Sequence, residues 1–182
     1  MDESRYDVVV IGAGVAGENA ADRAVQGGLT VALVEQDLVG GDCSYWACMP
    51  TKALLRPGQA LRAAQHVAGA AQAIVGGLDA DAVLARRDDT IHHRSDASQV
   101  EWVAGAGIDL VRGVARLDGP RRVRVAREDG RETALLARAA VVVATGSDPV
   151  IPAIDGLRDA DPWTSREAAA SSRVPASLAV IG

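Results

Sequence analysis

The only two cysteines and the only lysine of this chain fall within residues 40–52. Cys43 and Cys48 are five residues apart, and Lys52 follows Cys48 by four. Two thiols can form and break a disulfide by thiolate attack, and a nearby ammonium group stabilises the thiolate. The residue types and their spacing therefore predict a redox-active disulfide centre.

The spacing of the pair also restricts the backbone between them. On a regular helix, residues five apart have Cα atoms ~8–9 Å apart on different faces. A disulfide needs Cα atoms within about 7 Å, so a bridge between Cys43 and Cys48 requires an irregular turn. Pro50 is best tolerated in the first turn of a helix, which places Cys48 near a helix start, where the helix dipole stabilises a thiolate. Lys52 then lies one turn further along the same face.

Other interpretations of these residues are weaker. A purely structural bridge over so small a loop would contribute only about 2 kcal/mol. Two cysteines supply half of a zinc shell, so no metal site is predicted. Tyr45 and Trp46, between the cysteines, either shield the sulfurs, contact a substrate or pack against the neighbouring helices. Surface solvation is the default interpretation of the three histidines, which are His66, His92 and His93.

A glycine-rich turn precedes the cysteine segment. Residues 6–11 read as a short buried strand, and Gly12, Gly14 and Gly17 follow it in the pattern G-x-G-x-x-G. The first glycine permits a tight turn, the second lets backbone amides approach a pyrophosphate, and the third lets the helix pack closely on the strand. The free N–H groups and dipole at the helix N-terminus favour phosphate.

An acidic residue completes this motif. The Ala-rich helix ends near Gly27, residues 29–34 form a second strand, and Glu35 stands at its end, 21 residues after Gly14. A carboxylate there can accept hydrogen bonds from both ribose hydroxyls and repels a 2′-phosphate. The unit therefore predicts dinucleotide binding. A tight turn without a ligand would explain neither Glu35 nor Gly14.

The remaining elements predict an α/β fold. This is a Rossmann-like domain with a parallel sheet, helices and a three-stranded antiparallel meander. Pro57 and Gly58 could interrupt the first long helix. The last five residues echo the strand and glycine of residues 8–12, and are expected to be the first strand of a second, incomplete nucleotide-binding domain. The predicted elements are helices 52–76 and 79–104, meander strands 109–117, 121–127 and 131–136, a parallel strand 139–145 and a connection 148–162.

Composition excludes several function classes. The net charge of −5 and the absence of a basic stripe argue against a nucleic-acid partner or an acidic membrane surface. No apolar run reaches the ~18 residues of a membrane span. The acidic N-terminus lacks the regions of a signal peptide. We therefore expect a cytoplasmic protein, and in that compartment a disulfide is more often catalytic than structural.

The sequence resembles the class I flavoprotein disulfide reductases, or pyridine nucleotide-disulfide oxidoreductases, which include dihydrolipoamide dehydrogenase, glutathione reductase and mercuric reductase. The resemblance covers nearly the whole chain. Its most specific part is the element Gly-Gly-x-Cys-x4-Cys-x-Pro-Thr-Lys at residues 40–52. It is carried by residues 8–17, Glu35, 40–52, 113–115, 144–146 and 178–182.

The resemblance implies FAD as cofactor and NAD(P)H as co-substrate. Electrons would pass from NAD(P)H through FAD and the Cys43–Cys48 disulfide to a small-molecule disulfide, a lipoyl group or a metal ion. Cys48 resembles the flavin-proximal thiol, Cys43 the interchange thiol, and Lys52 the lysine close to the flavin. The other residues implied to bind the cofactor are Gly12, Gly14, Val15, Ala16, Gly17, Glu35, Gln36, Gly41, Asp42, Ala115, Ala144, Thr145 and Gly146.

The resemblance also implies a larger protein. Residues 1–152 would be the FAD-binding domain with the redox disulfide, and residues 153–182 a connector and the first strand of an NAD(P)-binding domain. The full-length protein would be a homodimeric, EC 1.8.1-like oxidoreductase, and these 182 residues alone would be inactive. Asp42, Tyr45 and Ala47 stand where Thr, Asn and Gly are common in the family, which leaves the substrate open. The alternatives are a dinucleotide-binding module without turnover and a single NAD-binding Rossmann domain.

Overall fold

The computed structural model describes residues 2–181, and these divide into two compact units. The first unit comprises the residues up to Cys43 together with Ser95–Asp148. The second comprises Ser44–Arg94 together with the residues from Pro149 onward. Each unit is described by itself.

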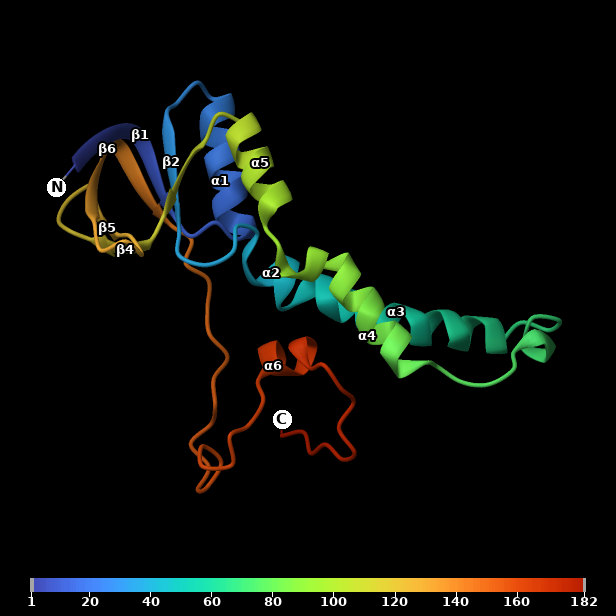
Figure 1. Ribbon diagram of the computed structural model, residues 1–182. Helices are drawn as coiled ribbons and strands as arrows, with labels where there is room; N and C mark the ends of the chain where they lie inside the picture. The colour runs from blue at the N-terminus through green and yellow to red at the C-terminus, as the bar shows by residue number, and fades with distance from the viewer. Residues whose placement is uncertain (1, 182) are drawn as a thin grey trace. The chain divides into compact units, whose positions relative to one another are not determined.

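The first unit is built on a β-sheet (Figure 1), whose six strands have the order β3-β2-β1-β6-β5-β4. β3, β2, β1 and β6 are parallel, while β6, β5 and β4 form an antiparallel meander. This confirms the predicted α/β fold, a Rossmann-like parallel sheet that carries a meander. The strands are β1 (Asp2–Ile11), β2 (Val31–Glu35), β3 (Asp109–Arg112), β4 (Val114–Leu117), β5 (Arg122–Ala126) and β6 (Glu132–Val143).

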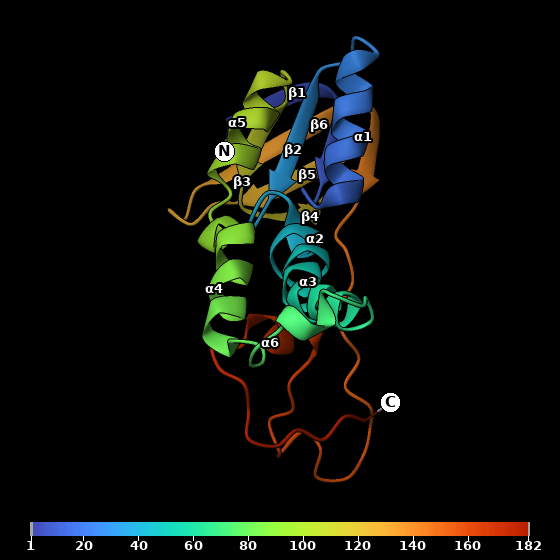
Figure 2. The same cartoon turned by 90° about the vertical axis from the view of Figure 1, so that its right-hand side faces the viewer.

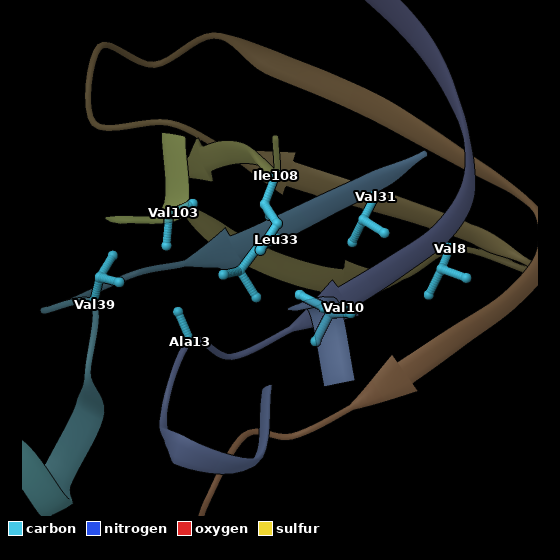
Figure 3. Packing of buried hydrophobic residues seen from close by; sticks show 9 residues of the cluster. Val8, Val10, Ala13, Val31, Leu33, Val39, Val103 and Ile108 are labelled. Atoms are coloured by element: carbon cyan, nitrogen blue, oxygen red, sulfur yellow. The ribbon is translucent and has the colours of Figure 1, made fainter. Parts of the chain in front are cut away.

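Alternation along β1 and β2 sends side chains to two separate cores. Val10 and Leu33 belong to the cluster shown in Figure 3, which also contains Ala21 of helix α1 (Val15–Gln26) and Val103 of helix α5 (Ala97–Gly105). Both helices therefore cover the same face of the sheet (Figure 2). The alternate residues of β1 and β2 point to the other face of the sheet and pack there with residues of the meander. The strand residues are Val9, Ile11, Ala32 and Val34, and the meander residues are Val123, Val125 and Leu135.

Two predictions for the strands are corrected by the pairing. Residues 131–136 and 139–145 are not two strands, because β6 runs continuously alongside β1 from its first residues to Val143, with one register shift. The predicted strand 109–117 divides at Gly113: β3 pairs with β2 in parallel, whereas β4 pairs with β5 antiparallel. A Cβ at Gly113 would lie 2.4 Å from the carbonyl oxygen of Ala126, so only glycine fits this change of partner.

The second unit contains α3 (Cys48–Gln65), η1 (Ala71–Ala73), α4 (Ala80–Thr90), η2 (His92–Arg94) and α6 (Ser165–Ala170). In Figure 1, α4 runs back along α3. Pro50 lies in the first turn of α3, as predicted, and the helix continues through Pro57 without the suggested interruption, although Pro57 has no N–H for the helix ladder.

The predicted helix over 79–104 is wrong. Asp79 caps α4 by accepting a hydrogen bond from the amide of Ala82, but the helix stops at Thr90. The next residues, His92, His93 and Arg94, all have φ between 50° and 59°, which is left-handed backbone. A right-handed helix cannot pass through three such residues, so a new helix begins only at Ala97.

Arginines hold the second unit together. The buried Arg87 donates to the carbonyl oxygens of Ala169 and Ser171 at 2.7 and 3.0 Å, which anchors the end of α6 to α4. Trp46 lies between two guanidinium groups, with Arg94 and Arg166 at 4.4 and 4.2 Å from its ring centroid. Such cation–π contacts are worth roughly 0.5–1 kcal/mol each at exposed sites. Of the two aromatic residues between the cysteines, Trp46 therefore packs against Arg94 and Arg166, and Tyr45 is buried.

Residues 178–181 do not form the predicted strand. They have no regular secondary structure and are exposed, and Gly182 lies outside the described residues. A strand requires a neighbour to accept and donate its ladder hydrogen bonds, and no strand within residues 2–181 pairs with this segment. Among residues 2–181, no helix has both the length and the apolar character to cross a bilayer.

Asp7 lies at the register shift of β1 and predicts a pH effect on stability. Its carboxylate accepts from the amide and hydroxyl of Thr30 and from Arg138, and these bonds lower its pKa to about 2. The stabilisation is present above the ordinary value near 4 and is lost as the pH falls towards 2. We expect the urea midpoint of Asp7→Asn to fall less than that of the wild type between pH 4 and pH 2. For Asp148→Asn, on an exposed loop, the midpoint should fall with pH as steeply as in the wild type. Equal slopes for the two variants would contradict this assignment.

Candidate functional site

The three fingerprint glycines have different steric surroundings. Gly12 has a φ of +97°, and a Cβ there would lie 2.3 Å from the carbonyl oxygen of Ala144. A Cβ on Gly17 would lie 1.8 Å from the carbonyl oxygen of Gly12, so α1 packs directly on the turn. Gly14 is different, because a Cβ there would approach nothing closer than Gly41 Cα at 4.0 Å. Gly12 and Gly17 thus shape the turn, and Gly14 leaves space beside it.

Glu35 holds the glycine turn from the end of β2. One carboxylate oxygen accepts from the amide of Ala13 and the other from the amide of Asp37, both at 2.7 Å. Each oxygen can still accept a further hydrogen bond, since a carboxylate has about four acceptor sites. The sequence predicted a ribose-binding role for this carboxylate, and did not indicate that it also fixes the main chain around it.

The carboxyl ends of the parallel strands enclose a small cavity of about 100 Å³. Residues far apart in the sequence meet in its wall, and five of them were predicted to bind the cofactor: Gly12, Glu35, Gln36, Ala115 and Thr145. Ala144 adjoins it through a 2.8 Å bond from its amide to the Ile11 carbonyl oxygen. Ligands of open α/β sheets bind at this edge. The structure therefore brings these predicted residues together, and their contacts with a cofactor stay a prediction.

A larger hollow of about 780 Å³ shares Gln36 and Gly113 with this cavity. Its wall contains Asp96 and Arg112, which the sequence analysis missed. Asp96 accepts from the amide of Val39 at 2.9 Å and is paired with Arg112. Burial alone raises the pKa of Asp96, but these partners outweigh it and lower the pKa overall. Sequence spacing gave no signal for this pair, which fixes the loop after β2.

The segment that leads to the first cysteine runs beside the glycine turn. The amide of Gly40 donates to the carbonyl oxygen of Ala13 at 2.8 Å, and Gly14 and Gly40 form an isolated bridge. Helix α2 (Gly41–Tyr45) starts there, and its third residue is the half-buried Cys43. The remaining predicted residues around this turn are Val15, Ala16 and Asp42, which are exposed, and Gly146, which follows the end of β6.

Cys48 and Lys52 belong to the second unit. Cys48 is the first residue of α3, which places its sulfur at a helix N-terminus as predicted. Lys52 is exposed one turn further on the same face. Both cysteines carry thiols in the structure, so the disulfide is not formed there and stays a prediction.

The three histidines are exposed, in agreement with the expectation of surface solvation. His66 contacts the Arg62 carbonyl oxygen, and His93 pairs with Asp89. Within residues 2–181, no group of three or more His, Cys, Asp or Glu side chains is arranged to hold a metal ion.

Glu18 is a carboxylate in the first turn of α1 that sequence reasoning did not single out. One of its oxygens is buried without a hydrogen-bond partner among the described residues. Burial raises the pKa of Glu18, and the negative charge of Glu35 raises it further. The ionised form of Glu18 is therefore disfavoured in the folded protein.

Replacing the carboxyl group of Glu18 tests how much its ionised form destabilises the folded protein. Because the folded-state pKa is raised, ionised Glu18 destabilises the fold above its ordinary value and has no such effect where it is protonated. We expect Glu18→Gln to raise the thermal midpoint at pH 7 and to leave it unchanged at pH 4. Glu101→Gln, on the exposed face of α5, is the control. A lower midpoint for Glu18→Gln at pH 7 would show that the carboxylate makes a contact stronger than its desolvation.

Comparison with known proteins shows the family of this chain. A model of the pyridine nucleotide-disulphide oxidoreductase family matches residues 6–182. Mercuric reductase from Staphylococcus aureus is 32% identical over 97% of this chain and 31% of its own length. Dihydrolipoyl dehydrogenase 3 from Pseudomonas putida is 39% identical over 97% of this chain and 38% of its own length. The chain thus spans about a third of the length of these relatives.

Solved structures of a flavoprotein disulfide reductase have a similar fold. The Cu(II) complex of the HOCl-induced flavoprotein disulfide reductase RclA from Escherichia coli has a TM-score of 0.67 and 25% identity, covering 83% of this chain and 31% of RclA. A mutant of RclA has a TM-score of 0.75 over 96% of this chain and 36% of its own, at 23% identity, which supports the fold alone. With the family match over nearly all residues, the chain belongs to the pyridine nucleotide-disulphide oxidoreductase family.

Proposed function

We propose that this chain binds FAD and supplies the flavin site and the redox thiols of an NAD(P)H-dependent, EC 1.8.1-like disulfide oxidoreductase. The observation that carries the proposal is the glycine turn, where Gly14 leaves open space while Glu35 holds the turn by accepting a hydrogen bond from the amide of Ala13. Membership of the family supports the same activity.

The residues present fit FAD. The N-terminus of α1 offers its free amides to the pyrophosphate, and Gly14 carries no side chain that would block it. Glu35 has acceptor capacity left for the hydroxyls of the adenosine ribose. The cavity lined by Ala115 and Thr145 and the larger hollow beside it give space at the carboxyl ends of the strands.

Bound FAD would supply two-electron transfer between a nicotinamide and the cysteine pair. The thiols of Cys43 and Cys48 then do the chemistry of the chain: one thiolate attacks the substrate, and the other completes the exchange. Lys52, on the face of α3 that carries Cys48, stabilises the thiolate by its positive charge. Cys48 is assigned to the flavin side and Cys43 to the substrate side.

The substrate is a small-molecule disulfide, a lipoyl group or a metal ion. The names of the relatives support this range, since they include mercuric reductases and dihydrolipoyl dehydrogenases. We further propose that the full-length protein is a cytoplasmic homodimer, as the resemblance implies. An alternative is a dinucleotide-binding module without turnover.

The cofactor distinguishes these functions. We expect the purified protein to be yellow and to release one FAD per chain, identified by its absorbance spectrum and chromatography. Gly14→Val should abolish FAD binding while the protein remains folded. Recovery of a nicotinamide dinucleotide instead of FAD would favour a single NAD-binding Rossmann domain. A folded protein that binds neither would refute the proposal.

A further inference from the structure

A groove between α3 and α4 is lined by three positive charges and by no carboxylate. Lys52 and Arg56 of α3 and Arg86 of α4 are exposed along a hollow of about 380 Å³. Met49 and Leu55 give the groove an apolar part, and these residues are 41% and 53% exposed. All of these residues lie in the second unit.

The three charges of the groove are not neutralised. Of the ion pairs formed within residues 2–181, none involves Lys52, Arg56 or Arg86. The neighbouring carboxylates of α4 are engaged elsewhere, because Asp88 pairs with Arg87 at 2.8 Å and Asp89 with His93 at 3.2 Å. Such a concentration of positive charge is unusual in a chain with a net charge of −5.

Two cations of the groove lie on the same face of α3 as Cys48. Cys48, Lys52 and Arg56 follow one another at intervals of four residues and share one face of α3. With a rise of 1.5 Å per residue, the two cations lie ~6 and ~12 Å along the helix axis from Cys48. An anion bound here is therefore one to two helical turns from the sulfur.

We propose that this groove binds an anionic group of the disulfide substrate, so that the protein selects low-molecular-weight disulfides that carry a carboxylate or a similar anion near the S–S bond. The inference rests on the proposed function and names its substrate class. The thiolate of Cys43, the sulfur assigned to the substrate side, attacks one sulfur of the substrate and expels the first thiolate product. The second cysteine displaces the other product, and the protein is left with the Cys43–Cys48 disulfide. Two electrons pass from the dithiol to the substrate, which leaves as two thiols.

The test compares an anionic with a neutral disulfide of similar size. The fully reduced protein is mixed with dithiobis(nitrobenzoate), which bears a carboxylate on each ring, or with dithiodipyridine, which is uncharged at neutral pH. Arg56→Gln with Arg86→Gln should slow the reaction with the anionic reagent about tenfold, because local charge raises the encounter rate of opposite charges. The reaction with the neutral reagent should change less than about twofold, because no charge attraction contributes to it.

Two controls make the result specific. Arg116→Gln with Arg173→Gln removes the same two charges from exposed positions outside the groove and should leave both rates unchanged. About 1 M salt should slow the wild-type reaction with the anionic reagent alone, because it reduces the range of exposed charges from about 10 Å to about 3 Å. Equal slowing of both reagents, or of neither, in the double variant overturns the proposal. The measurement needs neither flavin nor nicotinamide, so a failure of FAD binding would refute the proposed function separately.

Discussion

Gly17→Ala is expected to prevent the first unit from folding normally. The added Cβ would lie 1.8 Å from the carbonyl oxygen of Gly12, and that backbone is fixed in turn by its approach to Ala144. Neither group is the flexible end of a side chain, so α1 would have to move away from β1. Overpacking of a tight core costs ~1–3 kcal/mol, and this contact is more severe than most. We expect a loss of ~3 kcal/mol or more in the free energy of unfolding, measured by urea denaturation.

Gly14→Ala is the matched control in the same turn. Gly14 has a φ of −77°, which any residue adopts, and the nearest atom to its added Cβ is 4.0 Å away. We expect its stability to change by less than about 1 kcal/mol, whereas FAD affinity falls because the methyl group faces the proposed pyrophosphate. Equal destabilisation by both substitutions would mean that the turn tolerates no Cβ at all, and would remove the argument that Gly14 serves a ligand.

Cys48→Ser in the full-length protein is expected to abolish disulfide reduction. Oxygen replaces sulfur at the first residue of α3, so the helix is retained while the redox couple is lost. We expect turnover with a disulfide acceptor to fall about 10³-fold or more, as for loss of a covalent nucleophile. The amount of bound FAD should remain unchanged. Turnover near the wild-type rate would exclude the cysteine pair from the reaction.

The absorbance spectra of the reduced Cys43→Ser and Cys48→Ser variants show which sulfur lies on the flavin side. If Cys48 is on the flavin side, reduced Cys43→Ser should keep the thiolate-to-flavin charge-transfer absorbance, and reduced Cys48→Ser should lose it. Ser44→Ala, between the cysteines, controls for changes in the loop. Charge-transfer absorbance that survives in Cys48→Ser and disappears in Cys43→Ser would reverse the two roles.

The local motifs could be read from the sequence because each depends on residues close together in the chain. The glycine turn needs only a strand, three glycines and the first turn of α1, so its position was correctly predicted. The fold class was predicted for the same reason, since hydrophobic runs and turn residues mark the elements of the sheet. The start of α3 near Cys48 followed from Pro50 and its place in a first helical turn.

Only the tertiary structure decided which distant segments pair. Asp96 meets Arg112 and Val39, and Trp46 lies between Arg94 and Arg166, although nothing in their spacing indicates these contacts. The continuity of β6 depends on its pairing with β1, and the end of α4 on the left-handed residues that follow it. Periodicity reports which face of an element is apolar, but a strand partner or an ion pair is chosen by packing across the whole chain.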